Sequence, residues 1–517
     1  MSDAPRDEQG LDLALWIPLA LVLGGVALRA AFLMREGVWF DEAWTVDACR
    51  MAWPEMLARL RGDLHPQLYH SLAKVFSAAL GGATLFTVRL HSLLWGLGAI
   101  GLAAWAARQL WGRWRDGLAA AALLAASPMH YHYSVEARMY SMGGATVLAA
   151  GVCALLILRE AREGRWASGW LLAALPPLVF IATWTHYLAA PMLALLGLLG
   201  HFAGPWRGER ARGWATRWLG AWCIAGLLVL VLAVDAWSRR DTIVGTSQWM
   251  NDPAFAPGLV DLARSVSRSW LAPQDFAILR NVSLELGTGA ADFEGHAMDG
   301  ASALLALWLA WVMWRAEPSL RWIALLVGGV FVLSQMLLFA LFFTGVRVFF
   351  WPRYASLALP LLAVGAGPAV LRAAEASGRR AVEASVLACW LAGMTAVAGL
   401  LRSNQPDFQP LRAFLRERPD VAVVHAIGVG FWPLYEIGAG DARVQLVEFR
   451  REPPPAEPGP SYFLIVDTRG YPPLQPGLAT LEAVEADPRA RVIFDSGFHK
   501  LVELPEWTPP EYRAPGD

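Results

Sequence analysis

Two adjacent carboxylates, Asp41 and Glu42, stand a few residues beyond the first long apolar run of the sequence, 13–33. A partly desolvated carboxylate can accept the proton of a hydroxyl or an amine while that group attacks, which is general base catalysis. The same two residues could instead cap and solvate an amphipathic helix in a loop. Local sequence does not separate these two interpretations, and both stay open at this point.

His65 belongs to the same segment and directly precedes Pro66. Proline fixes its own φ and disfavours the helical region for the residue before it, so an extended entry into the following helix is predicted. His65 could bind a substrate or a metal there. The alternative is an interfacial histidine that is only solvated or hydrogen-bonded.

The stretch 127–140 contains many ionisable and aromatic side chains at a predicted membrane boundary. It contains His130, His132, Glu136, Arg138 and Tyr140. Ionisable groups at this depth are tolerated mainly when they pair with one another or face a wet cavity, so a functional site is the first hypothesis. Glu136 and Tyr140 are predicted to lie one helical turn apart on a shared face, and Arg138 could reach a phosphate. A structural Glu–Arg pair with interfacial tyrosines is the alternative.

Two histidines of this stretch raise the question of a metal. His130 and His132 have a spacing that, with carboxylates nearby, could hold a divalent cation, but this spacing alone is weak evidence. A divalent metal therefore stays possible, and no metal ligands are assigned. His186 stands at the outer end of a predicted span, where it could line the same cavity or belong to an aromatic belt.

Arg347 and Arg353 precede a late apolar span, on the side of the membrane where the predicted topology otherwise disfavours arginine. An anionic partner such as a lipid phosphate or pyrophosphate would account for them, since guanidinium groups bind phosphate and neutralise developing charge. Snorkelling of each side chain at a helix end is the common alternative.

The elements that must position these residues are membrane spans. The chain has 517 residues, of which 56% are hydrophobic and 17% charged, and this is more apolar material than one soluble core needs. The apolar residues come in runs of roughly 18 or more, the length that a helix needs to cross the hydrocarbon layer. About eleven spans are predicted, at 13–33, 85–107, 117–129, 140–158, 168–185, 188–203, 217–236, 301–315, 321–344, 354–371 and 381–401.

The positions of the arginines predict how these spans are oriented in the membrane. With a cytoplasmic N-terminus, the cytoplasmic loops hold most of them, as the positive-inside rule requires: Arg108, Arg113, Arg115, Arg159, Arg162, Arg165, Arg207, Arg210, Arg212, Arg217, Arg372, Arg379 and Arg380. The segments 34–84, 130–138, 237–300 and 345–353 then lie outside a cell inner (plasma) membrane, as does the C-terminal region. The first run is too long for a signal-peptide core and is predicted to be a retained span. The net charge of −1 gives no general attraction to nucleic acid.

The pattern changes near residue 402, which divides the chain into a predicted membrane domain, 1–401, and an extracytoplasmic domain, 402–517. Short β-type runs and one helix predict a small soluble α/β unit there. The runs are Val421–Val424, Val444–Val447, Phe463–Val466 and Val492–Phe494, and the helix is Leu411–Arg418. The proline-rich stretch Glu452–Pro460 is predicted to be an exposed loop of that domain.

Taken in order, these segments resemble the GT-C class of membrane glycosyltransferases. Within that class they are similar to glycosyltransferase family 39 and its bacterial relatives, which include protein O-mannosyltransferases, lipid A aminoarabinose transferases and lipopolysaccharide-core sugar transferases. The likeness covers roughly residues 10–400 and rests on short motifs in the expected order. The motifs are Asp41–Glu42, His65–Pro66 through Tyr69, Arg89–Leu90, Ser134–Tyr140, Thr185–Tyr187, and Arg353–Tyr354 before Leu359–Pro360.

The resemblance implies a GT-C fold and an inverting transfer of a sugar from a polyprenyl-phosphate carrier to an acceptor outside the cytoplasm. Asp41 would be the general base with Glu42 beside it, and the arginines would hold the lipid phosphate. The other implied substrate contacts are His65, Tyr69, His132, Glu136, Tyr140 and His186. Gln67 departs from the family pattern, where a second proline usually follows His-Pro, and this leaves the backbone after Pro66 freer.

A lipid-linked donor also agrees with the predicted side of the site, because nucleotide sugars are cytoplasmic and no nucleotide-binding Gly-rich loop is present in the cytoplasmic segments. A transporter or flippase of a lipid-linked sugar is the alternative, but it should place charges near mid-membrane and show paired half-repeats. A non-catalytic scaffold would leave Asp41 and the cluster around Glu136 without a purpose. The sugar stays open, and the acceptor could be a lipid, a glycan or a protein.

Overall fold

The computed structural model describes a helical bundle and one β-sheet. The described ranges are 13–34, 40–61, 65–165, 168–204, 209–240, 306–343, 352–377, 409–421, 423–427, 444–446, 454–456, 459–466, 477–495 and 499–510, with positions 63, 259, 262, 263, 266, 303 and 304. The predicted span 381–401, the candidate site residue Arg347 and most of the predicted outer segment 237–300 lie outside these ranges.

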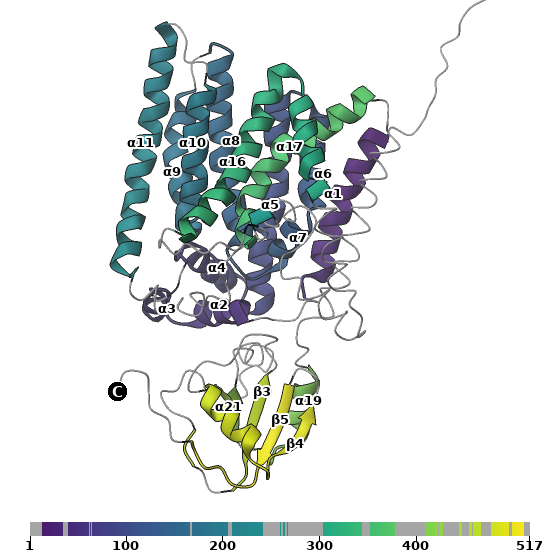
Figure 1. Ribbon diagram of the computed structural model, residues 1–517, viewed down its shortest axis with the longest axis vertical. Helices are drawn as coiled ribbons and strands as arrows, with labels where there is room; N and C mark the ends of the chain where they lie inside the picture. Colours follow the sequence, from purple (N-terminus) through teal and green to yellow (C-terminus); the bar gives the residue numbers. More distant parts are fainter. Residues whose placement is uncertain are drawn as a thin grey trace, which may run out of the picture.

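Long, roughly aligned helices form the bundle (Figure 1). They are α1 (Leu13–Phe32), α5 (Leu85–Trp111), α6 (Trp114–Ala125), α8 (Tyr140–Arg162), α9 (Gly169–Thr185), α10 (Ala189–Ala203), α11 (Glu209–Ser238), α16 (Pro318–Phe343) and α17 (Ala355–Ser377). Within the described residues, five of these helices are long and apolar enough to cross a membrane, and three shorter helices are apolar. The prediction of an α-helical polytopic membrane protein is confirmed; the total of about eleven spans stays a prediction.

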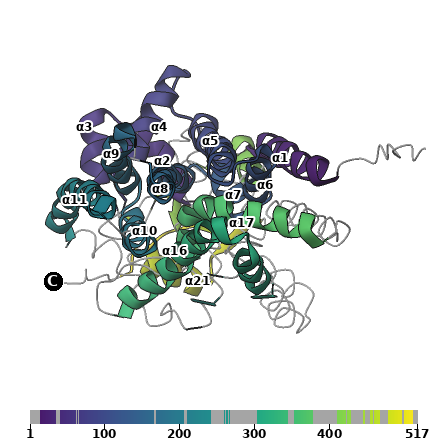
Figure 2. The ribbon, with the colours of Figure 1, turned by 90° about the horizontal axis from the view of Figure 1, so that it is seen from above.

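Helix α17 runs through the middle of the bundle. It contacts α5, α6, α8 and α16, whereas α1 and α11 lie at the periphery (Figure 2). Small residues allow this close packing: a Cβ atom added at Gly367 would lie 2.7 Å from the backbone of Ala119 and Ala120 in α6. In a membrane, close backbone approach replaces much of the hydrophobic drive that packs helices in water.

The predicted span 117–129 is in fact two short helices, and this prediction was wrong. Helix α6 ends at Ala125, and α7 (Pro128–Val135) begins where Ser127 caps the backbone N–H of His130 at 3.3 Å. Serine at the cap and proline at the first helical position both favour a new helix start. The predicted outer turn 130–138 is therefore helical up to Val135. Glu136 then has extended backbone, φ −89° and ψ 136°, so it does not lie one helical turn from Tyr140 as predicted.

A buried arginine stabilises this break. The Arg29 guanidinium on α1 donates to the Ala125 carbonyl at 2.8 Å, at the C-terminal end of α6, and its other terminal nitrogen lies 3.1 Å from Nδ1 of His130. A cation at a helix C-terminus satisfies a carbonyl that has no partner in its own helix. Arg29 thus joins α1 to both sides of the α6–α7 junction.

The predicted outer segment 34–84 contains three further helices at one end of the bundle (Figure 1). They are α2 (Phe40–Arg50), α3 (Trp53–Leu60) and α4 (Leu68–Ala79). Asp41 and Glu42 stand in the first turn of α2, where the helix dipole favours negative charge. Pro66 precedes α4 without entering it, as expected.

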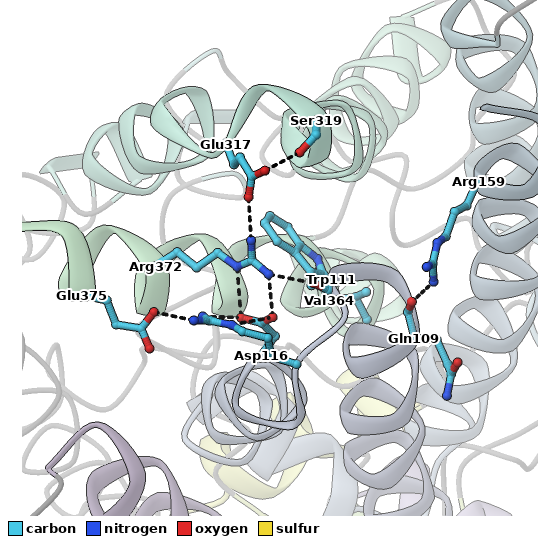
Figure 3. Close-up of polar contacts among 10 residues, drawn as sticks. Gln109, Trp111, Asp116, Arg159, Glu317, Ser319, Val364, Arg372 and Glu375 are labelled. Carbon is cyan, nitrogen blue, oxygen red and sulfur yellow. Dashed lines mark hydrogen bonds and ion pairs between the residues drawn. The ribbon is translucent and has the colours of Figure 1, made fainter. Parts of the chain in front are cut away.

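The opposite end of the bundle is held by a charged cluster around Asp116 (Figure 3). Asp116 is fully buried at the start of α6 and accepts from Arg372 of α17 at 2.9 Å. Arg372 also donates to the Trp111 carbonyl of α5 at 2.6 Å and to Glu317, just before α16, at 2.9 Å. One guanidinium therefore connects the ends of four helices.

The C-terminal part contains a five-stranded sheet of order β2-β1-β3-β5-β4. Its strands are β1 (Val424–Ile427), β2 (Val444–Leu446), β3 (Ser461–Val466), β4 (Arg491–Asp495) and β5 (His499–Leu504), and its helices are α19 (Gln409–Glu417) and α21 (Gly477–Ala486). The strands β2, β1 and β3 are parallel, whereas β5 pairs antiparallel with β3, and β4 pairs antiparallel with β5. The small α/β unit is confirmed; β1 begins three residues later than predicted, and β5 and α21 were not predicted.

Both faces of this sheet are covered. Tyr462 and Leu464 of β3 belong to one core with Leu411 of α19, while Phe463 belongs to a second core with Val484 of α21. The alternation follows from the two-residue period of a strand. The sheet lies beyond the end of the bundle that carries α2, α3 and α4 (Figure 1).

The Gly367→Ala substitution is expected to destabilise the bundle. The new Cβ would meet backbone atoms of α6 at 2.7 Å, which cannot move aside as a flexible side chain would, so the cost is about 1–3 kcal/mol. Thermal unfolding of the purified protein in detergent measures it. Gly226→Ala on α11 is the control, because a Cβ there meets nothing within 4 Å, and an equal effect of both substitutions would contradict the packing argument.

Candidate functional site

The site is centred on Asp41, whose side chain is about one quarter exposed. Its Oδ2 atom lies 3.8 Å from Nη2 of Arg138 and 3.9 Å from Nη1 of Arg353. The two arginines are far apart in sequence: Arg138 stands between α7 and α8, and Arg353 belongs to a short 3-10 turn, Pro352–Tyr354, before α17. Thr45, one turn after Asp41, accepts from Nη1 of Arg138 at 3.2 Å. The fold therefore brings together one carboxylate and two guanidinium groups.

Glu42 has a different environment from its neighbour. Arg89 of α5 donates to both of its carboxylate oxygens, at 2.7 and 2.6 Å, and both side chains are only 1% exposed. The backbone N–H of Ala137 donates to the same carboxylate at 2.8 Å, and Arg89 donates to the Leu33 carbonyl at 3.0 Å. Successive helical residues point about 100° apart, so one side chain can face the site while the next is buried. Glu42 thereby ties α2 to α5 and to the backbone beside Arg138.

Glu136 is a second buried carboxyl group next to the site. Its Oε2 atom lies 3.8 Å from Nε2 of His132. Burial, together with the nearby charge of Glu42, raises the pKa of Glu136 to about 8, against the opposing influence of Arg353 and Arg138. Burial would lower the pKa of Arg138, but the carboxylates Asp41 and Asp63 more than offset this and hold it above its ordinary value. Glu136 is thus largely protonated at neutral pH, while Arg138 stays charged.

Aromatic rings and imidazoles line up beside these charges. The His186 ring centroid lies 5.0 Å from that of His65, 5.4 Å from that of Tyr354 and 5.8 Å from that of Tyr140. Burial lowers the pKa of His186 to about 3 and holds the pKa of His65 well below its ordinary value, with Arg138 adding to both effects. Neutral imidazoles can both donate and accept hydrogen bonds, which suits contact with sugar hydroxyl groups.

Tyr69 has a supporting position. Its hydroxyl lies 2.7 Å from Oγ of Ser92, and that Oγ lies 3.3 Å from the backbone carbonyl of Arg138. The side chain of Tyr69 is fully buried. Its described hydrogen bond therefore holds the backbone beside the site and is not directed at Asp41.

The structure brings together most of the residues that the sequence predicted. Asp41, Arg138 and Arg353 meet, the pair of His132 and Glu136 lies beside them, and His65, Tyr140 and His186 form the row of rings. Sequence reasoning missed Thr45, and it placed Arg89 and Tyr354 only within motifs. A charged residue inside an apolar run is a signal that would have singled out Arg89.

The two histidines of the proposed metal spacing face different partners. His130 lies beside Arg29, and His132 beside Glu136. In the part of the chain that the structure describes, no group of three or more His, Cys, Asp and Glu side chains is arranged to hold a metal ion.

Comparison with known proteins gives similarity in structure alone. No family model matches the chain, and no curated protein matches it. Among solved structures, ArnT from Cupriavidus metallidurans bound to undecaprenyl phosphate is 15% identical, with a TM-score of 0.48, over 94% of this chain and 98% of that one. An oligosaccharyltransferase from Archaeoglobus fulgidus, in complex with Zn and sulfate, is 13% identical, with a TM-score of 0.44, over 83% of this chain and 62% of that one.

Glu42→Ala is expected to destabilise the protein by about 3–5 kcal/mol, because it leaves the Arg89 guanidinium buried without its carboxylate. The thermal midpoint in detergent measures this loss. Asp47→Asn removes one partner of the more exposed pair with Arg59 and should cost about 1 kcal/mol or less. Adding Arg89→Met to Glu42→Ala should recover part of the stability, and equal midpoints for the two single variants would contradict the buried-pair argument.

Proposed function

We propose that this chain is an inverting glycosyltransferase of the GT-C type, which transfers a sugar from a polyprenyl-phosphate carrier to an acceptor outside the cytoplasm. The proposal is supported by one observation above the others: Asp41 stands between two arginines at 3.8 and 3.9 Å. These distances differ from those of the structural ion pairs in the same chain, where Glu42–Arg89 is 2.6 Å and Asp116–Arg372 is 2.9 Å.

That difference in distance has a chemical meaning. Charge-assisted hydrogen bonds between guanidinium and carboxylate groups are about 2.7–2.9 Å long. The arginines near Asp41 are close enough to attract the carboxylate but lie beyond hydrogen-bond distance of it. A phosphate placed between them would accept from both guanidinium groups, and Asp41 would remain available for a proton.

The proposed reaction is a single displacement. The acceptor hydroxyl or amine attacks the anomeric carbon of the sugar and transfers its proton to Asp41. The bond from that carbon to the phosphate oxygen breaks, its electron pair leaves on the polyprenyl phosphate, and the configuration at the carbon inverts. Arg138 and Arg353 stabilise the charge that develops on the phosphate. Glu42, being held by Arg89, positions α2 so that Asp41 faces the acceptor.

The two ends of the bundle support an assignment of the side of the membrane. The arginine-rich cluster around Asp116 marks one end, and the site lies at the other with α2, α3 and α4 (Figure 1). By the positive-inside rule the site faces away from the cytoplasm of a plasma membrane. We place the C-terminal domain, 402–517, on the same outer side, and the membrane domain, 1–401, carries the chemistry.

The position of the charges also bears on the transporter alternative. A transporter binds its substrate near mid-membrane, whereas the clusters around Asp41 and Asp116 lie at opposite ends of the bundle. This arrangement favours an enzyme that works at the membrane border.

Asp41→Asn is expected to lower the transfer rate at least about 100-fold, since the amide cannot accept the acceptor's proton. Transfer is measured as the sugar content of envelope glycolipids and glycoproteins by mass spectrometry, in cells that express equal amounts of each variant. Asp47→Asn, in the same helix but paired with Arg59, should keep the wild-type rate. Wild-type transfer by the Asp41 variant would remove this residue from the base role.

Arg353→Gln is expected to weaken binding of the lipid phosphate about 10- to 100-fold, the loss of one charge-assisted hydrogen bond. Titration of the purified protein in nanodiscs with undecaprenyl phosphate measures the dissociation constant. Arg321→Gln near the start of α16, at the other end of the bundle, is the control and should leave it unchanged. An unchanged constant for the Arg353 variant would exclude its phosphate-binding role.

A further inference from the structure

Thr45 is the residue of α2 that holds the tip of the Arg138 side chain. It stands four residues after Asp41, so the two side chains lie on the same face of the helix. The side chain of Thr45 is fully buried, and its hydroxyl donates to the Asp41 backbone carbonyl at 2.8 Å. This bond directs the hydroxyl hydrogen along the helix, which leaves the oxygen lone pairs to accept from Nη1 of Arg138 at 3.2 Å.

The guanidinium of Arg138 spans these two residues of α2. Its Nη1 atom is bonded to Thr45, while its Nη2 atom lies 3.8 Å from Oδ2 of Asp41. A guanidinium is a rigid planar fork, so the position of one terminal nitrogen determines the reach of the other. The hydroxyl of Thr45 therefore sets the distance between Nη2 and the carboxylate.

The backbone of Arg138 is held separately from its guanidinium. The backbone N–H donates to the Glu136 carbonyl at 2.8 Å, and the backbone carbonyl accepts from the Ser92 hydroxyl at 3.3 Å. Within the described residues, the buried Nε atom of Arg138 has no hydrogen-bond partner, and the contact with Asp41 is longer than a hydrogen bond. Among these residues, Thr45 thus makes the hydrogen bond that orients the guanidinium.

We propose that Thr45 is a positioning residue, which keeps Arg138 turned toward the donor phosphate and prevents it from closing onto Asp41. This inference rests on the proposed function, because the phosphate is that of the lipid-linked donor. Without the hydroxyl, Nη1 would be a buried donor that has lost its acceptor, which is costly. A shift of about 1 Å toward Asp41 would convert the separation of 3.8 Å into a charge-assisted hydrogen bond.

Closure of this pair would impair both parts of the proposed reaction. A guanidinium that is hydrogen-bonded to Asp41 has to be released before it can bind a phosphate oxygen, so the affinity for the donor falls. The same hydrogen bond engages the carboxylate that accepts the proton of the attacking group. Thr45 keeps the two charged groups close to each other and yet available to different parts of the substrate.

The test is titration of the purified full chain in nanodiscs with undecaprenyl phosphate. Thr45→Val has nearly the same shape but lacks the hydroxyl, and its dissociation constant should rise about tenfold or more, because one charge-assisted hydrogen bond now competes with the phosphate. Thr45→Ser keeps the hydroxyl and lacks the methyl group, and it should stay within about twofold of wild type.

Thr146→Val is the matched control. Thr146 is a buried threonine of α8 whose hydroxyl donates to the carbonyl four residues before it, that of Met142, at 2.9 Å. Its replacement removes the same kind of bond within a helix and should leave the dissociation constant unchanged.

A second background separates positioning from a general effect on the fold. In Asp41→Asn the carboxylate is absent, and an amide holds a guanidinium more weakly than a carboxylate does. Adding Thr45→Val to Asp41→Asn should therefore change the dissociation constant by no more than about threefold, since the two residues act on one interaction. An equal loss of affinity from Thr45→Val in both backgrounds would overturn the inference.

The other outcomes distinguish this inference from the proposed function. Wild-type affinity in Thr45→Val, or a loss in Thr45→Ser as large as that in Thr45→Val, would overturn the positioning role while the donor site stands. If Thr45→Val does not fold, Thr45→Ala gives the same contrast, because alanine and serine both lack the methyl group and serine alone keeps the hydroxyl. Absence of binding by the wild-type protein would overturn the proposed function as well.

Discussion

The buried ion pair between Glu42 and Arg89 is the contact on which the whole site depends. It joins α2 to α5, and the Ala137 N–H that bonds to the same carboxylate joins both helices to the segment that carries Arg138. Burying two charges is costly, and this pair withstands the cost because both carboxylate oxygens and the guanidinium are hydrogen-bonded. The neighbouring Asp41 can stay partly exposed because its helix is held by another residue.

The site is built from residues that are distant in sequence and that lie at or beside the ends of helices. Asp41, Arg138 and Arg353 come from α2, from the junction of α7 and α8, and from the turn before α17. Each of these positions is irregular backbone or a first helical turn, where side chains are not committed to packing against a neighbouring span. The regular interior of the bundle supplies the rigidity, and the end that carries α2, α3 and α4 supplies the polar groups.

Sequence patterns predicted the class of the molecule because long apolar runs and their flanking arginines are local signals of a membrane bundle. They also predicted that Asp41, Arg138 and Arg353 would lie close together, since segments assigned to one side of a membrane lie at one end of the helices. Local sequence could not predict that Glu42 is buried while Asp41 is partly exposed. This difference is decided by Arg89, which lies in another helix. Helix α7 was missed for a related reason: its apolar and aromatic residues continue the preceding run, and only Ser127 and Pro128 mark the break. Strand β5 was missed because His499, Lys500 and Glu503 interrupt its apolar pattern.

Helix α17 has one charged anchor at each end, Arg353 before its first residue and Arg372 in its last turns. At a rise of about 1.5 Å per residue, these two positions lie roughly 28 Å apart along the axis, close to the thickness of about 30 Å of a hydrocarbon layer. Since Asp116 holds Arg372, the depth of Arg353 is set by the helix and not by the lipids around it. The activity proposed above should therefore be greatest in bilayers whose acyl chains place the headgroups at the level of that arginine, and it should decline in thinner or thicker membranes.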